Sequence, residues 1–302
     1  MLKLLNITLL FFCGSLFSQN ISLTAPPERL NPEGVTYGGI PKITQDGNYI
    51  ITGGNKHKGL FLLDGNGTLI KELNSDFSAG WSFKLNQAGN KIVTRTKNFD
   101  SGLSKIIEID YSNFTTKTLS ESSDPGIPFY SKSGKSVIFS DGESVKQFPP
   151  LDTDDIGVVL SGSSIKINGA FEVQNFNSIS NYFENSNVLF FEFNPSHTKV
   201  AVHAAGEGIR IIDFNTGETY QLRNGEYPCW INDNYLTFMI TETDGRVTIN
   251  SDIIVASYDG SAYSNITKDF NIPVFYPWAN LQGEIVFKDG YGNIYKTKII
   301  IN

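Results

Sequence analysis

Three histidines are the side chains in this sequence best suited to metal binding or to proton transfer near neutral pH. His57 lies in a lysine-rich segment, His197 in a predicted turn, and His203 at the end of a predicted strand. A metal site needs several ligands that converge on one point, and only the last two histidines are close in sequence. We therefore interpret the histidines as surface or packing residues, and we predict neither a metal nor a cofactor.

One short acidic segment has the composition of a calcium loop. Asp152, Asp154 and Asp155 supply carboxylates. A loop of the EF-hand type needs oxygen ligands at alternating positions followed by glycine, and Ile156 interrupts that pattern. We interpret this segment as a solvated acidic loop.

Nucleophilic chemistry has little support in the sequence. The pattern Gly-x-Ser-x-Gly of a serine hydrolase elbow is absent. The two cysteines are Cys13 and Cys229, and the first lies in an apolar N-terminal stretch that we expect to be removed. The remaining cysteine has no partner for an intramolecular disulfide, so we predict a buried structural thiol and no catalytic residues.

The three tryptophans are candidates for a sugar-binding surface. Trp81, Trp230 and Trp278 all lie on or beside predicted strands of the same kind. Aromatic rings can line a carbohydrate site, but large rings also fill the space between packed twisted sheets. We favour packing for these residues.

Composition and charge restrict the class of partner. The chain has 302 residues, a formal net charge of -7 and no cluster of basic residues. Nucleic acid is therefore excluded as a partner, because binding to phosphates requires grouped Lys and Arg. The richness in Gly, Asn, Ser, Thr, Phe and Tyr favours strands and turns over helices.

The first 18 residues have the pattern of a secretory signal. Lys3 is followed by a mostly apolar stretch from Leu4 to Phe17, and Ser18 is a small residue suited to cleavage before Gln19. An uncleaved membrane anchor is the alternative, although the apolar stretch is short for a span of about 20 residues. We predict no membrane span in the mature chain. The protein should be secreted across the inner membrane to the periplasm or the exterior.

A repeat of about 40 to 50 residues organises the rest of the chain. Each copy has an apolar residue, a polar turn that contains Gly, Asn or Asp, and then an apolar strand. The copies begin at Ile43, Leu85, Tyr130, Phe193, Trp230 and Ala279. This period, with four strands in each unit, is typical of the blades of a β-propeller.

The sequence therefore predicts an all-β fold, a six-bladed β-propeller with four antiparallel strands per blade. We assign residues 1–18 to the signal peptide and residues 19–302 to a single propeller domain. The last copy ends at Asn302 before a fourth strand, whereas Ile21–Thr24 forms a strand with no blade of its own. We expect this N-terminal strand to complete the last blade and close the ring, because closure removes exposed sheet edges.

The interval after the third copy contains about 20 residues more than a blade needs. The excess lies at about residues 149–187, in or after the third blade. It includes a predicted hairpin over Ile165–Val173, in which Asn168-Gly169 suits a type I′ turn. Four aromatic residues in this segment are predicted to bind a partner: Phe171, Phe176, Tyr182 and Phe183. The alternative is that these rings pack on the third and fourth blades.

The repeat resembles the WD-like propeller repeat of the TolB family, which reads Pro-x-Trp-Ser-Pro-Asp-Gly-x-x-Ile-x-Phe. The segments Pro228–Asp233 and Pro41–Gly47 match it best, whereas Ser196-His197 replaces the expected Asp-Gly. The resemblance covers nearly all of the predicted mature chain and implies the propeller fold. TolB also carries an α/β domain before its propeller, and the residues before the first repeat here are too few for one.

Our prediction is a secreted, non-catalytic β-propeller that acts as a binding or scaffold protein of the cell envelope. Its partner is expected to be a protein or another envelope component, with carbohydrate also possible. The alternative is a propeller-fold lyase or hydrolase that acts on a carbohydrate at the mouth of the central channel. Convergent His, Glu, Asp or Arg side chains from several blades would favour that alternative.

Overall fold

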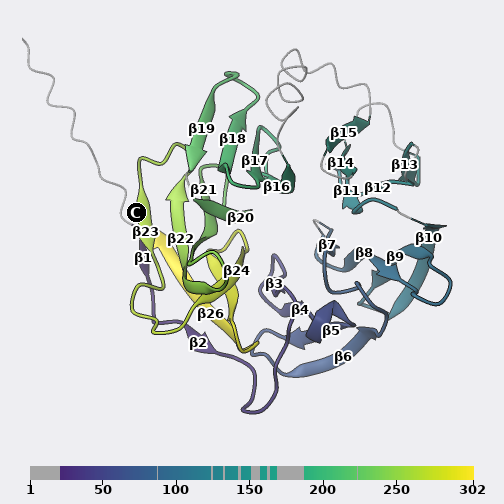
Figure 1. The fold of residues 1–302 in the computed structure, drawn as a ribbon, viewed down its shortest axis with the longest axis horizontal. Helices are drawn as coiled ribbons and strands as arrows, with labels where there is room; N and C mark the ends of the chain where they lie inside the picture. The colour runs from purple at the N-terminus through teal and green to yellow at the C-terminus, as the bar shows by residue number, and fades with distance from the viewer. Residues whose placement is uncertain are drawn as a thin grey trace, which may run out of the picture.

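Six antiparallel sheets surround a common axis and form the blades of a β-propeller (Figure 1). The structure is a computed structural model that describes residues 21–86, 88–123, 125–131, 133–141, 144–150, 157–161, 164–168, 187–222 and 224–302. The six copies of the sequence repeat all begin on the innermost strand of a blade. The predicted fold class is therefore confirmed.

The first three blades follow one another along the chain. Blade 1 consists of β3 (Lys42–Ile43), β4 (Tyr49–Gly53), β5 (Leu60–Asp64) and β6 (Leu69–Asn74). Blade 2 consists of β7 (Lys84–Leu85), β8 (Lys91–Lys97), β9 (Ser104–Asp110) and β10 (Thr115–Ser122). Blade 3 contains β11 (Phe129–Tyr130), β12 (Val137–Ser140) and β13 (Val145–Phe148).

The other blades complete the ring. Blade 4 consists of β16 (Val188–Phe193), β17 (Lys199–Ala204), β18 (Gly208–Asp213) and β19 (Thr219–Leu222). Blade 5 consists of β20 (Gly225–Trp230), β21 (Tyr235–Thr243), β22 (Thr248–Ser257) and β23 (Tyr263–Asn265). Blade 6 contains β24 (Val274–Ala279), β25 (Glu284–Asp289) and β26 (Ile294–Ile301).

The N-terminal segment closes the ring, as the sequence predicts. β1 (Ile21–Leu23) pairs antiparallel with the end of β26, and β2 (Glu28–Arg29) pairs with its beginning. Both the N–H and the hydroxyl of Thr24 donate hydrogen bonds to the carbonyl oxygen of Lys298, at 2.9 and 3.0 Å. The first described residues thus supply the outer strand of blade 6. This blade therefore combines N-terminal strands with C-terminal strands, which closes the ring.

The aspartates that end the third strands act in turns. The carboxylate of Asp64 accepts hydrogen bonds from the backbone N–H groups of Asn66 and Thr68, at 2.9 and 2.8 Å. Asp213 makes the same kind of contact to Asn215. These side chains satisfy turn N–H groups that the sheet leaves unpaired, which explains why the residue recurs between third and fourth strands.

The described part of the excess segment contains one hairpin. β15 (Ser164–Asn168) pairs with β14 (Gly157–Ser161), which precedes it. The second half of the predicted Ile165–Val173 hairpin, at residues 169–173, lies outside the described residues. The two strands form a sheet of their own beside blade 3.

Strand direction gives the propeller two distinct faces. Since the strands of a blade alternate in direction, the connections between blades and the loops between second and third strands lie on one face. We call it the connection face, and we call the opposite one the turn face. Among the described residues no helix is long and apolar enough to span a membrane. A single turn of 3-10 helix, η1 (Asn55–His57), lies on the connection face.

Candidate functional site

Each innermost strand places one equivalent side chain in the centre of the propeller. This side chain belongs to the residue one position before the start of each repeat. Together these residues form what we call the channel ring: Lys42, Lys84, Phe129, Glu192, Cys229 and Trp278. Alternation along a strand sends every second side chain to the same side, so one position per blade converges on the axis.

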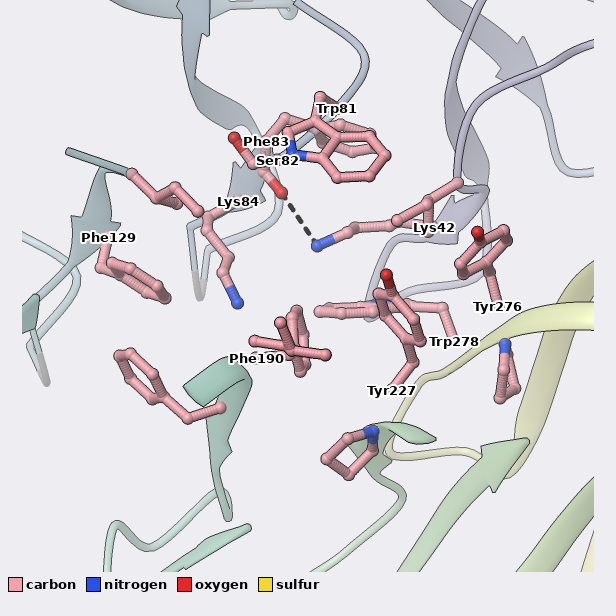
Figure 2. A pocket seen from close by; sticks show the side chains of 16 residues that line it. Lys42, Trp81, Ser82, Phe83, Lys84, Phe129, Phe190, Tyr227, Tyr276 and Trp278 are labelled. Carbon is pink, nitrogen blue, oxygen red and sulfur yellow. Dashed lines mark hydrogen bonds between the residues drawn. The ribbon is translucent and has the colours of Figure 1, made fainter. Parts of the chain in front are cut away.

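A second layer lies two residues earlier in each strand, toward the connection face. We call it the mouth ring, and its members are Ile40, Ser82, Ile127, Phe190, Tyr227 and Tyr276. Together with part of the channel ring, it lines a cavity of about 60 Å³ (Figure 2). That volume holds about four water-sized groups. On the other side of the channel ring, a cavity of about 280 Å³ extends toward the turn face.

Two tyrosines of the mouth ring are held by irregular strands. The pairing register shifts between Glu226 and Cys229 in blade 5, and between Phe275 and Trp278 in blade 6. Tyr227 and Tyr276 lie in these bulges with φ values of 52° and 57°, a conformation that costs energy for a bulky residue. Their rings meet edge to face with centroids 4.8 Å apart. Strain at two equivalent positions marks the mouth as a feature beyond simple packing.

Lys42 is a buried amine enclosed by aromatic rings. Its side chain is only 3% exposed, and its Nζ lies 3.6 Å from the centroid of the Trp278 ring. The Nζ donates a hydrogen bond of 2.8 Å to the carbonyl oxygen of Phe83 (Figure 2). Burial, followed by the nearby charge of Lys84, holds the pKa of Lys42 well below its usual value, although Glu192 opposes this effect. The cavity therefore disfavours the second positive charge.

Lys84 extends into the same space from the neighbouring blade. Its Nζ forms an ion pair of 2.6 Å with the Glu192 carboxylate and lies 4.5 Å from the centroid of the Phe190 ring. The channel ring thus contains two lysines and one glutamate. With both amines protonated it carries a net positive charge in a low-dielectric environment, where electrostatic interactions are strong.

Cys229 contributes a thiol to the channel ring without nucleophilic character. Burial raises the pKa of Cys229 to about 12, so the reactive thiolate is scarce near neutral pH. The sulfur accepts a hydrogen bond of 3.3 Å from the backbone N–H of Ala279. Its burial agrees with the predicted structural thiol. The arrangement as a whole offers charge and apolar surface, which are the means of binding a ligand.

The three histidines do not converge. His57 packs against Trp81 on the connection face with ring centroids 4.3 Å apart, whereas His197 stacks on Phe193 on the turn face. His203 is buried in β17. The described residues contain no group of three or more His, Cys, Asp or Glu side chains placed to hold a metal ion. The absence of a bound metal stays a prediction.

The tryptophans have three different environments. Trp230 is buried, and its indole N–H donates a hydrogen bond of 2.9 Å to the carbonyl oxygen of Glu192, which links blades 4 and 5. Trp278 belongs to the channel ring. Trp81 remains 40% exposed at the mouth of the channel. Packing describes the first, whereas the other two line the candidate site.

The aromatic residues predicted to bind a partner, Phe171, Phe176, Tyr182 and Phe183, lie outside the described residues. The acidic segment at residues 152–155 does so too. Sequence reasoning missed Lys42, Lys84 and Glu192. Their signal was present, because each stands at the same place in its repeat, where a core strand would be expected to hold an apolar residue.

His203 makes the stability of blade 4 sensitive to acid. It is 4% exposed, and its Nδ1 has no hydrogen-bond partner among the described residues. Burial lowers the pKa of His203 from 6.5 to about 4. Because the unfolded chain binds a proton in this interval and the folded protein does not, stability should fall by about 3 kcal/mol as the pH drops from 6.5 to 4. Urea unfolding of wild type and His203→Leu across that range tests this expectation. Equal pH slopes for the two proteins would contradict it.

Comparison with solved structures identifies the fold. The crystal structure of the Myceliophteria thermophila Cps50 (Swd1) β-propeller domain aligns with a TM-score of 0.51 and 7% identity, over 91% of this chain and 100% of that one. TolB from Acinetobacter baumannii aligns with a TM-score of 0.49 and 16% identity, over 84% of this chain. The chain spans 55% of the length of that TolB chain. The alignment with the Cps50 domain, at 7% identity, shows the β-propeller fold and nothing finer. No protein-family model and no curated protein matches the sequence.

Proposed function

We propose that this protein is a secreted, non-catalytic β-propeller that binds a protein or another component of the cell envelope through its connection face. The observation that carries the proposal is the group of exposed apolar side chains on this face, which includes the ring pair Phe77 and Phe99. Eight large ones lie on the connection face, with exposed fractions of 40% or more: Val35, Phe77, Trp81, Phe99, Leu189, Val247, Ile249 and Tyr291. Exposed apolar surface of this extent is typical of interaction sites.

The other eight exposed large apolar side chains among the described residues lie on outer strands or at the turn face: Leu23, Leu69, Ile70, Phe114, Phe148, Tyr263, Leu281 and Ile300. What is particular to the connection face is a pair of rings, because Phe77 and Phe99 meet edge to face with centroids 5.1 Å apart. Lys58 covers the Phe77 ring at 5.1 Å. Aromatic residues surrounded by polar groups are typical of the centre of a protein interface.

The channel ring supports binding over catalysis. Lys84 and Glu192 neutralise each other at 2.6 Å, which leaves neither free for proton transfer while paired. The carbohydrate lyase or hydrolase alternative requires a convergent acid and base at the mouth. A candidate acid is Glu226, which precedes Tyr227 in β20 and whose pKa is raised by burial. A polysaccharide-cleaving activity that the wild type shows and Glu226→Gln abolishes would favour that alternative.

Site-specific photo-crosslinking in the native host tests the binding proposal. A photoreactive phenylalanine analogue in place of Phe99 should yield a discrete crosslinked product in the envelope fraction. The matched control places the analogue at Leu281, which is 54% exposed on the turn face and should give none. With the analogue kept at position 99, Phe77→Ser should weaken the product and leave the melting temperature nearly unchanged, because Phe77 is 40% exposed and contacts the ring at position 99. Equal crosslinking at both positions, or at neither, would contradict the proposal.

Secretion rests on the sequence of the first 18 residues and needs its own measurement. Mass spectrometry of the protein from the extracytoplasmic fraction should find a mature N-terminus at Gln19. An uncleaved N-terminus on protein found in the cytoplasm would contradict secretion. Binding through the connection face would still be tested by the crosslinking experiment.

A further inference from the structure

The cavity at the channel mouth is lined by two lysines, whereas Glu192 lines the cavity on the other side of the channel ring. The Nζ of Lys42 and of Lys84 both reach it, from blades 1 and 2 (Figure 2). An ammonium group has three N–H donors. Among the described residues, Lys42 donates to the Phe83 carbonyl and Lys84 to the Glu192 carboxylate. Donor capacity is therefore left over on both amines.

Apart from Ser82, Tyr227 and Tyr276, the rest of the cavity lining is apolar. The Lys84 Nζ lies 4.6 Å from the Phe129 ring and 4.5 Å from the Phe190 ring, and Ile40, Ile127 and Leu189 complete the wall. An apolar enclosure strengthens the attraction of a cation for an anion, because water does not screen it. It also accommodates an apolar group attached to that anion.

We infer that the cavity binds an organic carboxylate, with the carboxylate between Lys42 and Lys84 and its apolar part against the rings of the mouth. The volume of about 60 Å³ fits a carboxylate with a short stem. A larger apolar group would extend outward, toward Trp81 and Tyr227 on the connection face. A carboxylate has two oxygens and can accept from both amines at once.

Two sources supply this chemistry, a free small acid and the C-terminal carboxylate of a protein chain that ends in an apolar residue. Both would present the same group to the same amines. The inference stands apart from the proposed docking surface, because the channel ring and the exposed residues of the connection face can be altered separately.

Binding should be coupled to the charge on Lys42. The groups that face its amine are Lys84 from β7, Glu192 from β16 and Cys229 from β20. A bound carboxylate would raise the pKa of Lys42 back toward its usual value, so complex formation should take up protons where the free amine is neutral. Affinity should accordingly decrease as the pH rises.

Isothermal titration with 3-phenylpropionate tests the small-acid source. We expect saturable binding that is weakened at least about tenfold by Lys42→Met and by replacing the acid with 3-phenylpropanamide. Titrations in buffers of different ionisation enthalpy should reveal the proton uptake. The matched control is Lys296→Met, since the Lys296 Nζ also donates to one carbonyl, that of Gly65 at 2.7 Å, but lies outside the channel. This control should bind like the wild type.

Peptides that end in phenylalanine, with either a free carboxylate or an amide, test the second source. Binding of the free-acid peptide alone would assign the site to a chain terminus, and binding of 3-phenylpropionate alone would assign it to a small acid. If wild type binds neither acid, or if Lys42→Met binds as well as wild type, the inference is wrong. Phe99→Ser should leave carboxylate binding unchanged, which separates this result from failure of the proposed docking function.

Discussion

Deletion of residues 19–26 is expected to lower the melting temperature by about 10 °C. The deletion removes β1, whose three residues pair with Ile299–Ile301 at the end of β26, together with the two hydrogen bonds of Thr24. Each lost hydrogen bond costs about 1 kcal/mol, and a newly exposed sheet edge adds to this cost. Differential scanning calorimetry gives the measurement.

A side-chain control separates ring closure from the loss of apolar surface. Leu23 is 37% exposed, so Leu23→Ser keeps the backbone pairing of β1 and removes only a partly exposed group. We expect this variant to melt close to the wild type. An unchanged melting temperature after the deletion would show that β1 is not needed to close the ring.

Replacing the two channel lysines by methionine should change stability in opposite directions. Lys84→Met leaves the Glu192 carboxylate without its ion pair, and we expect a loss of about 3 kcal/mol. This loss is at the low end of the range for breaking a buried ion pair, because the Glu192 side chain is 24% exposed. Lys42→Met removes a buried amine that forms no ion pair with any of the described residues. We expect a gain of about 1 kcal/mol, the net of removed desolvation and lost ring contact.

The pH dependence of the second variant provides a further check. The pKa of Lys42 is lowered in the folded protein, so the unfolded chain binds more protons between that depressed value and 10.5. Wild-type stability therefore rises with pH across this interval, and the advantage of Lys42→Met should shrink toward zero. Urea unfolding of both variants at several pH values measures these effects. Losses of equal size for the two variants would contradict the ion-pair assignment.

The sequence contained the architecture because the repeat is local. The turn residues and apolar strands of each copy are read within about 45 residues, and the first residues of the copies, such as Ile43 and Phe193, all lie on innermost strands. Even ring closure could be predicted, since a blade that lacks its fourth strand leaves an edge that Ile21–Thr24 is able to cover.

The excess segment shows what a local motif leaves out. Asn168-Gly169 is a strong turn signal, but the second half of the predicted hairpin lies outside the described residues. β15 pairs with β14, and the sequence analysis did not anticipate this pairing.

The candidate site was decided by the tertiary structure alone. Lys42, Lys84 and Glu192 stand in three different blades, and Lys84 and Glu192 are 108 positions apart in the chain. Their meeting depends on six strands being arranged around one axis, so that one side chain from each turns inward. Sequence pattern determines which way a strand faces within its blade, because alternation is a local property. Which charges then share a low-dielectric space, and hence how the amines of Lys42 and Lys84 influence each other, follows only from closing the ring.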